Sequence, residues 1–540
     1  MPFLRSKYFY VFSSILLLYG CIVTKHSDPY QKLLNKNLKG SELGQMKFLY
    51  GDMGGIYPHT LKSNGFVYKI ALLALSTISE KKFQIIDSLF ASYGFGINPA
   101  DENPYHSKPI GLIFGSLSGI HPIKGKYQIE VADLGCGSCH SGALYGKDGM
   151  PSKEFVLGMP NTSLNLDVFS NDLFKGYINL LSLNEKQFQI SILKLFPETS
   201  SKELNGLKIF FKQLKKEVPK ILKTRNNPAL YKIGGPGLVN GIGAIKAGLG
   251  LINSKTYDDT QGALNAIPAL ANISFKSSLL VSGNYAPIHS NFFEEISCQD
   301  TSYLHAKSLA KIVSIFTIGT MGYNAKLASK ALTDIEEIMI YLSKLETPPF
   351  PASINLSKSE LGRNIFQLKC QSCHGTYEGS LYRNKLLSFP NKLIALEQIG
   401  TDSIRALAIH QEDFNILQKL PQKGWFQTAV QKGYVAPVLS GIWATAPYFH
   451  NNSVPTLWHL FHPESRPKAF YCGGHELDYE RVGIKGILKN GIYQYNYPEW
   501  SNHANYDTQQ RGLSNLGHEK IFNPLTETEK ENLIEFLKTL

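Results

Sequence analysis

Two short motifs contain the residues of this chain best suited to chemistry. Each has the pattern Cys-x-x-Cys-His, and they occupy positions 136–140 and 370–374. Two thiols three positions apart can form thioether bonds to the vinyl groups of one porphyrin, and the adjacent histidine can then bind the iron. The predicted attachment and ligand residues are Cys136, Cys139, His140, Cys370, Cys373 and His374. The sequence therefore predicts two covalently bound haem c groups.

One such motif alone would also suit half of a zinc site or a redox-active dithiol. A zinc knuckle, however, places its two Cys-x-x-Cys pairs close together in sequence, whereas the two motifs here are far apart. Two complete motifs in an exported chain favour haem over both alternatives.

The first thirty residues resemble an export signal. Arg5 and Lys7 precede an uncharged apolar run at 8–19, and the Leu-Tyr-Gly-Cys sequence at 18–21 resembles a bacterial lipobox. The run is shorter than the roughly 20 residues that a membrane-spanning helix needs. We therefore expect a lipoprotein signal peptide at 1–20 and a periplasmic or cell-envelope protein, anchored to the membrane surface through lipid on Cys21. Cys298 and Cys472 would then remain available to pair with each other.

Composition excludes a disordered chain. The 540 residues are 43% hydrophobic and 18% charged, which is enough for a large core and two or more domains. The formal charge of +12 comes from scattered Lys and Arg residues that do not alternate with aromatic ones, so no nucleic-acid site is expected. A basic surface suits an acidic electron-donor protein, and a small donor protein or a quinol-linked chain is the expected redox partner.

An internal repeat accompanies the two motifs. Pro, Leu, Ile and Val at 268, 270, 273 and 281 match Pro, Leu, Ile and His at 437, 439, 442 and 450, always at the same interval. The segments 268–284 and 437–453 therefore resemble two copies of one haem-pocket element. The interval between the haem motifs is longer, so extra residues must follow the first motif, and the predicted helices within 163–232 account for them.

Helical patterns and a proline-rich linker define the domains. Helices are expected at 332–345, at 361–368 after a Ser357/Glu360 capping box, and at the C-terminus after a Thr526/Glu529 capping box. The prolines at 348–351 cannot continue a helix. We therefore predict a mainly α protein made of two c-type cytochrome domains related by duplication, with long loops and a helical insertion in the first domain. The predicted domains are 21–350 and 351–540.

The second half resembles a known family. Residues 441–457, the Arg-Pro pair at 466–467 and the Asn-Leu-Gly-His run at 515–518 are similar to the bacterial di-haem cytochrome c peroxidase superfamily, and most of all to its rubber-oxygenase-like branch. The resemblance covers the chain from about residue 125 onward and is most specific in the second domain. It implies a pair of haem c domains, one of which meets peroxide or dioxygen while the other passes electrons.

The resemblance also assigns site residues. Because no methionine follows Met339, a histidine is expected as the sixth ligand of the haem on His374. The resemblance favours His518, since the Asn-x-Gly-His motif supplies a distal ligand in the rubber-oxygenase-like branch. The other histidines available there are His410, His450, His459, His462, His475 and His503. Val281 of the first repeated segment matches His450 of the second, so the first segment offers no ligand at that position. The haem on His140 is therefore expected to be the open, reactive one.

Peroxide chemistry at an open haem needs a carboxylate that moves a proton, and Glu294 or Glu295 is the predicted catalytic acid. His289 or His305 could instead bind the iron and close the site. Two features depart from the family: Leu280 and Val281 replace an aromatic residue, and Pro437 replaces an arginine.

Three functions are compatible with these residues. A peroxidase-like oxidoreductase requires one open haem that reacts with hydrogen peroxide, and it is the principal prediction. An oxygenase of an apolar substrate requires dioxygen and a hydrophobic channel beside His140. A plain electron carrier requires that both haems have six ligands.

Overall fold

The computed structural model describes residues 38–51, 65–78, 87–96, 109–224, 234–248, 263–321, 323–497 and 503–540. The predicted signal peptide at 1–20 and the lipidation site Cys21 lie outside these ranges. In the ranges described, no helix combines the length and the apolar character that crossing a membrane requires.

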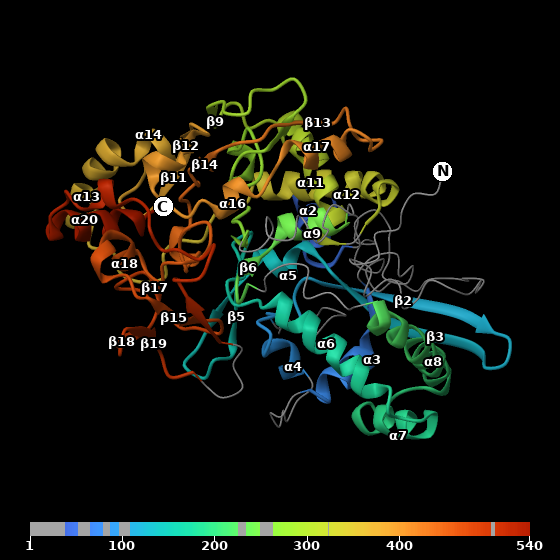
Figure 1. Ribbon diagram of the computed structural model, residues 1–540. Helices are drawn as coiled ribbons and strands as arrows, with labels where there is room; N and C mark the ends of the chain where they lie inside the picture. The colour runs from blue at the N-terminus through green and yellow to red at the C-terminus, as the bar shows by residue number, and fades with distance from the viewer. Residues whose placement is uncertain are drawn as a thin grey trace.

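A long hairpin leads into the first motif. Strands β2 (Leu112–His121) and β3 (Gly125–Leu134) pair antiparallel along their whole length, and the short β1 (Phe66–Val67) extends the sheet on the other side of β3. In Figure 1 the two long strands project from the body of the molecule. Residues 127–131, which lead toward the first motif, lie within β3. Strand β3 ends two residues before Cys136, so the hairpin positions the start of the first motif.

Helices cover this sheet and enclose an aromatic core. Helix α8 packs on β3, and α3 packs on α6. The ring of Phe169 on α6 lies 5.1 to 6.1 Å from those of Phe66, Phe90 and Phe95. The helices are α3 (Tyr68–Ser76), α4 (Asp87–Ala91), α6 (Leu166–Leu180), α7 (Glu185–Leu195) and α8 (Ser201–Thr224). The helices expected within 163–232 are thus present.

A helix pair stands beside each motif. In the first pair, α2 (Gly40–Tyr50) crosses α12 (Ala325–Ser343), and a Cβ atom at Gly44 would lie 2.2 Å from the backbone oxygen of Glu337. Phe48 then packs on Tyr341, with ring centroids 5.7 Å apart. Helix α11 (Tyr303–Thr320) packs along α12 in the centre of Figure 1.

The second pair repeats this crossing. Helix α13 (Leu356–Lys369) packs on α20 (Glu527–Leu537), and a Cβ atom at Gly362 would lie 1.9 Å from the backbone oxygen of Asn532. The capping box at Thr526 and Glu529 is confirmed. The predicted box at 357–360 is wrong, because the Asn355 side chain accepts the hydrogen bond from the Lys358 N–H and begins the helix earlier.

The remaining elements are short. The 3-10 helices η2 and η3 each close a loop in one of the repeated segments. These elements are β4 (Ser141–Tyr145), β5 (Pro151–Leu157), β6 (Leu238–Val239), α9 (Gly241–Gly248), β7 (Asn265–Ala266), η2 (Ile273–Phe275), β8 (Tyr285–Pro287), β9 (Ile296–Ser297), β10 (Thr376–Gly379), β11 (Asn384–Phe389), β12 (Leu393–Ala395), α15 (Leu396–Ile399), α16 (Ile404–Leu407), α17 (Gln411–Leu417), β13 (Phe426–Thr428), β14 (Gly433–Val435), η3 (Ile442–Ala444), α18 (Leu457–Phe461), η4 (Pro463–Ser465), β15 (Ala469–Cys472), β16 (Leu477–Asp478), β17 (Gly483–Ile484), β18 (Ile487–Lys489), β19 (Ile492–Gln494), β20 (Ala504–Asp507) and α19 (Glu519–Phe522).

The predicted fold class is therefore wrong. The structure is mixed, with 41% helix, 20% strand and many small sheets, instead of mainly α with two cytochrome domains. The segments expected to be loops run through the interior, where each backbone N–H and C=O group needs a hydrogen-bond partner. They obtain these partners by pairing as strands of two to seven residues, most of them too short to leave an alternating pattern in the sequence.

Candidate functional site

One cavity contains both motifs. Its volume is about 1130 Å³, and its wall includes all four motif cysteines together with His140 and His374. The cavity exceeds the 300 to 1,000 Å³ of an ordinary small-molecule pocket, which leaves room for more than one small ligand. The helix α5 (Cys136–His140) and the helix α14 (Gln371–His374) hold the motif side chains at the wall.

Both motif histidines are oriented as metal ligands. The His140 Nδ1–H donates to the carbonyl oxygen of Pro268 at 2.9 Å, and the His374 Nδ1–H donates to that of Pro437 at 2.8 Å. A carbonyl oxygen can only accept, so Nδ1 must carry the proton and Nε2 keeps its lone pair. Burial lowers the pKa of His140 to about 4 and also lowers that of His374. Both imidazoles are therefore neutral at pH 7 and able to bind iron.

The two prolines begin the repeated segments, which share one local backbone conformation. In both, a residue with positive φ precedes the 3-10 helix, and a second residue with positive φ and an antiparallel bridge follow it. The matched features are Asn272 and Gly441, Leu280 and Phe449, and the bridges Leu279–Tyr285 and Tyr448–Val454. Each segment thus presents one carbonyl to a motif histidine and one wall to the cavity.

The motif thiols do not resemble those of a redox dithiol. Burial raises the pKa of Cys136 to about 11 and the pKa values of Cys139 and Cys370 to about 12. Redox-active Cys-x-x-Cys pairs need the opposite shift, because the thiolate is the nucleophile. In the part of the chain that the structure describes, no three His, Cys, Asp or Glu side chains gather as a metal site. Two thiols and one histidine at the wall of a large apolar cavity instead fit a covalently attached haem.

His518 lies opposite His374 across the cavity. Their ring centroids are 6.5 Å apart and their planes differ by 26°. Metal–imidazole bonds of about 2 Å would place two axial imidazoles with centroids roughly 6 Å apart. Burial, followed by the charges of His374 and Arg466, lowers the pKa of His518 to about 3. The geometry and the neutral ring fit a sixth ligand for a haem on His374, as the resemblance implied.

The other histidines considered for this role are placed elsewhere, apart from His450. The described histidines that line the cavity are His140, His374, His450 and His518. His459 is hydrogen-bonded to Thr456, and His462 is hydrogen-bonded to the carboxylate of Glu527 at 2.7 Å. His410 is exposed, and His503 stacks on Tyr497 outside the cavity wall.

His475 gives a prediction for stability. Its Nδ1 accepts the Gly473 N–H, and burial lowers its pKa to about 4. Between pH 6.5 and pH 4, His475 is therefore protonated in the unfolded chain but still neutral in the folded chain. The free energy of unfolding decreases as the pH falls through this window. The loss is roughly 3 kcal/mol. The variant H475N keeps an acceptor for the Gly473 N–H but has no group that titrates in this window. In urea unfolding, the decrease in its free energy of unfolding from pH 7 to pH 4 should therefore be smaller than that of the wild type by roughly 3 kcal/mol. Equal pH profiles would contradict this prediction.

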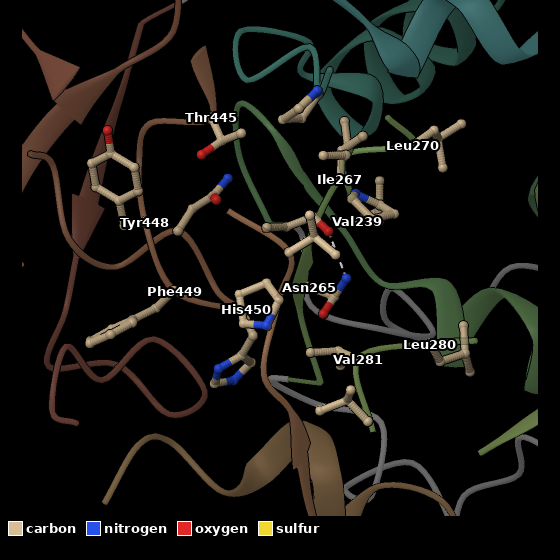
Figure 2. A pocket seen from close by; sticks show the side chains of 18 of the residues that line it. Val239, Asn265, Ile267, Leu270, Leu280, Val281, Thr445, Tyr448, Phe449 and His450 are labelled. Carbon is tan, nitrogen blue, oxygen red and sulfur yellow. Dashed lines mark hydrogen bonds between the residues drawn. The ribbon is translucent and has the colours of Figure 1, made fainter. Parts of the chain in front are cut away.

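The wall near the repeated segment of the first motif is apolar. Leu280 and Val281 line it together with Val239, Ile242 and Phe316, which come from β6, α9 and α11. Figure 2 shows Val239, Leu280 and Val281 on the cavity wall, with His450 contributed by the other repeated segment. Neither His289 nor His305 lines this cavity, and His305 Nε2 is hydrogen-bonded to the Lys276 carbonyl oxygen.

The predicted catalytic carboxylates do not reach the cavity. Glu294 and Glu295 are exposed and lie outside its wall, in the loop before β9. The carboxylate that lines the cavity within the described residues is Asp167, in the first turn of α6. Burial raises the pKa of Asp167, although its Oδ2 atom accepts the Gly234 N–H. Sequence analysis missed Asp167 because an acidic residue in the first turn of a helix is commonplace.

Two of the described cysteines, Cys298 and Cys472, lie outside the motifs. Cys298 is exposed and Cys472 is buried, and neither forms a disulfide.

Comparison with known proteins agrees with this site. A family model described as RoxA-like, cytochrome c-like matches residues 433–471, which include the Pro437 carbonyl, η3 and His450. Two uncharacterized proteins of Sinorhizobium fredii are similar to this chain. One, y4iM, is 26% identical over 37% of this chain and 52% of that protein. The other, y4iJ, is 30% identical over 36% of this chain and 41% of that protein.

The chain thus spans about half the length of the curated relatives it matches, or somewhat less. The match at residues 433–471 indicates a cytochrome c-like domain similar to that of the RoxA-like proteins, and such a domain implies covalently bound haem c.

Proposed function

We propose that this chain is a two-haem c-type oxidoreductase with one closed and one open haem. The observation that carries the proposal is the difference between the two motif histidines. His374 has His518 opposite it at 6.5 Å, whereas no histidine among the described residues near His140 takes that place. His374 and His518 would hold a haem suited to electron transfer, and His140 would hold a haem with a face open to the substrate.

The substrate class that the wall favours is an apolar molecule oxidised with dioxygen. Aliphatic and aromatic side chains surround the wall near Leu280, and they offer an apolar substrate a contact surface without charged groups, as Val239, Ile242 and Phe316 show. The similarity of residues 433–471 to RoxA-like cytochromes supports the same substrate class. The haem would supply the dioxygen chemistry, while the protein binds the substrate, excludes water and holds the iron through His140.

Peroxidase activity is the second candidate, and it rests on Asp167. Burial raises the pKa of Asp167, so this carboxyl at the cavity wall keeps its proton to a higher pH than an exposed aspartate does and is suited to proton transfer. D167N would then lower peroxidase activity by 10²-fold or more, whereas the exposed-site control E294Q would keep it.

The proposed location is the cell envelope, with lipid on Cys21 and a small electron-donor protein or a quinol-linked chain as the partner. The leader sequence and the basic surface support this location. C21A should release the protein from the membrane fraction into the soluble periplasm. Retention of C21A on the membrane would contradict lipid anchoring.

Spin-state spectroscopy tests the proposed difference between the haems. The ferric protein should give one high-spin and one low-spin signal in low-temperature EPR. H518A should convert the low-spin signal to high spin, because it removes the sixth ligand, and the control H410A changes an exposed histidine outside the cavity. Two low-spin signals in the wild type, before and after reduction and reoxidation, would favour the electron-carrier alternative.

Substrate assays then separate the two enzyme activities. The purified protein is incubated with an apolar polyene, such as a polyisoprene oligomer, under ¹⁸O₂. An oxygenase should yield carbonyl products that carry the label. A peroxidase should instead oxidise a reduced donor with hydrogen peroxide and leave the polyene intact.

A further inference from the structure

A buried arginine at the cavity wall has no carboxylate partner. Arg405, on the short helix α16, is 4% exposed and lines the cavity. Its Nη1 atom has no hydrogen-bond partner, and the described residues supply no ion pair to it. An arginine is almost never fully buried unless it is paired, because an uncompensated charge in the interior is costly. The site therefore lacks an anion.

Arg405 belongs to a small polar cluster. The nearby His450 is half-buried, and its Nε2 atom is shielded from solvent and has no hydrogen-bond partner. The His450 ring stacks on Tyr434, with centroids 4.2 Å apart, and the Tyr434 hydroxyl accepts the Ala406 N–H next to Arg405. Three polar side chains thus lie together at one place on the cavity wall.

This cluster lies where the two repeated segments meet. The Val435 N–H donates to the Val281 carbonyl at 2.8 Å, which joins the strand of Tyr434 to the first segment. The Ala266 N–H donates to the His450 carbonyl at 2.6 Å from the other side. Figure 2 places the His450 side chain between Phe449 and Val281, inside the cavity. A group bound here would lie between the two motifs.

The charges at the wall define the chemistry of that group. The described cationic residues at the wall are Lys276, Lys369, Arg405 and Lys520, whereas Asp167 is the acidic one. Carboxylates bind planar guanidinium groups through two parallel hydrogen bonds, and an imidazole N–H can donate a further hydrogen bond to a carboxylate.

We propose that Arg405 and His450 form a carboxylate-binding site at the junction of the two repeated segments, and that its ligand is a propionate of one of the two haems. The inference rests on the proposed haem attachment. Arg405 neutralises the propionate and thereby raises the reduction potential of that haem, because a nearby negative charge favours the ferric state. His450 acts as a second hydrogen-bond donor, not as an iron ligand.

The test uses the full-length holoprotein with R405Q, R405K and the control R383Q. Arg383 is a half-exposed arginine outside the cavity that pairs with Glu346. Haem content is counted first, and the potentials of both haems are then measured by spectroelectrochemistry. R405Q should lower the potential of one haem by about 59 mV, a tenfold change in its reduction equilibrium. R405K keeps the positive charge and R383Q changes a residue outside the cavity, so the reduction potentials of both variants should stay near those of the wild type.

The outcomes separate the two proposals. A wild-type protein without covalent haem would refute the proposed function itself. Two haems per chain with unchanged potentials in R405Q would overturn the propionate site alone. If R405Q fails to fold, resonance Raman spectroscopy compares the propionate bending bands of the wild type and R405K, and unchanged bands would overturn the site. If added acetate shifts the reduction potentials of the wild type, a soluble anion occupies the site of Arg405 and His450, and the propionate assignment is overturned.

Discussion

Replacing Cys370 and Cys373 together by serine is expected to lower the covalently bound haem from two groups per chain to one. A thioether cannot form without the thiol, and His374 alone leaves the second haem exchangeable. The remaining haem belongs to His140 and should keep the high-spin EPR signal. The reciprocal variant, C136S with C139S, should keep the low-spin signal of the pair His374 and His518. Acid–acetone extraction followed by pyridine haemochrome spectra gives the count.

Cys298 provides the matched control. It is a cysteine on the surface, outside the cavity, so C298S should retain two covalent haems. A wild-type protein with a single covalent haem would contradict the prediction at once. A C370S/C373S variant that keeps two covalent haems per chain would also contradict it.

Changing Gly362 to alanine is expected to destabilise the protein by about 3 kcal/mol. Alanine normally stabilises an exposed helix relative to glycine by about 1 kcal/mol, so the sign of the effect is itself the test. At Gly362 the added Cβ atom would lie 1.9 Å from the Asn532 carbonyl oxygen and 2.9 Å from the Phe536 side chain. Helices α13 and α20 would have to separate, and the adjoining second motif would lose its packing. Urea unfolding monitored by circular dichroism measures the difference.

Gly241, at the start of α9, is the control for this substitution. A Cβ atom there would meet no atom within 4 Å, and its φ is not in the left-handed region. G241A should therefore change stability by no more than about 1 kcal/mol. If G362A were as stable as the wild type while G241A behaved as expected, the close crossing of α13 and α20 would be refuted.

Features set by neighbouring residues could be predicted from the sequence. The Thr526 and Glu529 capping box depends on hydrogen bonds within one helical turn, and it is present as expected. Residues 127–131 alternate between apolar and polar side chains, as a strand with one buried face does, and they lie within β3. His518 was named by resemblance, and the structure places it opposite His374. In each case the signal lies within a few residues or in one recognisable motif.

Features that depend on distant contacts could not be predicted. Glu294 and Glu295 follow the repeated segment closely, yet the loop turns them to the solvent, while Asp167 reaches the cavity from a distant helix. Short strands form because distant segments supply hydrogen-bond partners, as β13 does for β8.

The sequence by itself determined the chemistry that this protein can carry, because Cys-x-x-Cys-His is a local covalent pattern that folding does not alter. Only the tertiary structure decided which side chains share the cavity. It brings His518 to His374, leaves an apolar wall near Leu280 and Val281, and buries Arg405 without a counter-ion. The physical reason is that the free energy of a buried charge or an unfilled ligand position depends on its neighbours in space, and those neighbours come from segments that are far apart in the chain.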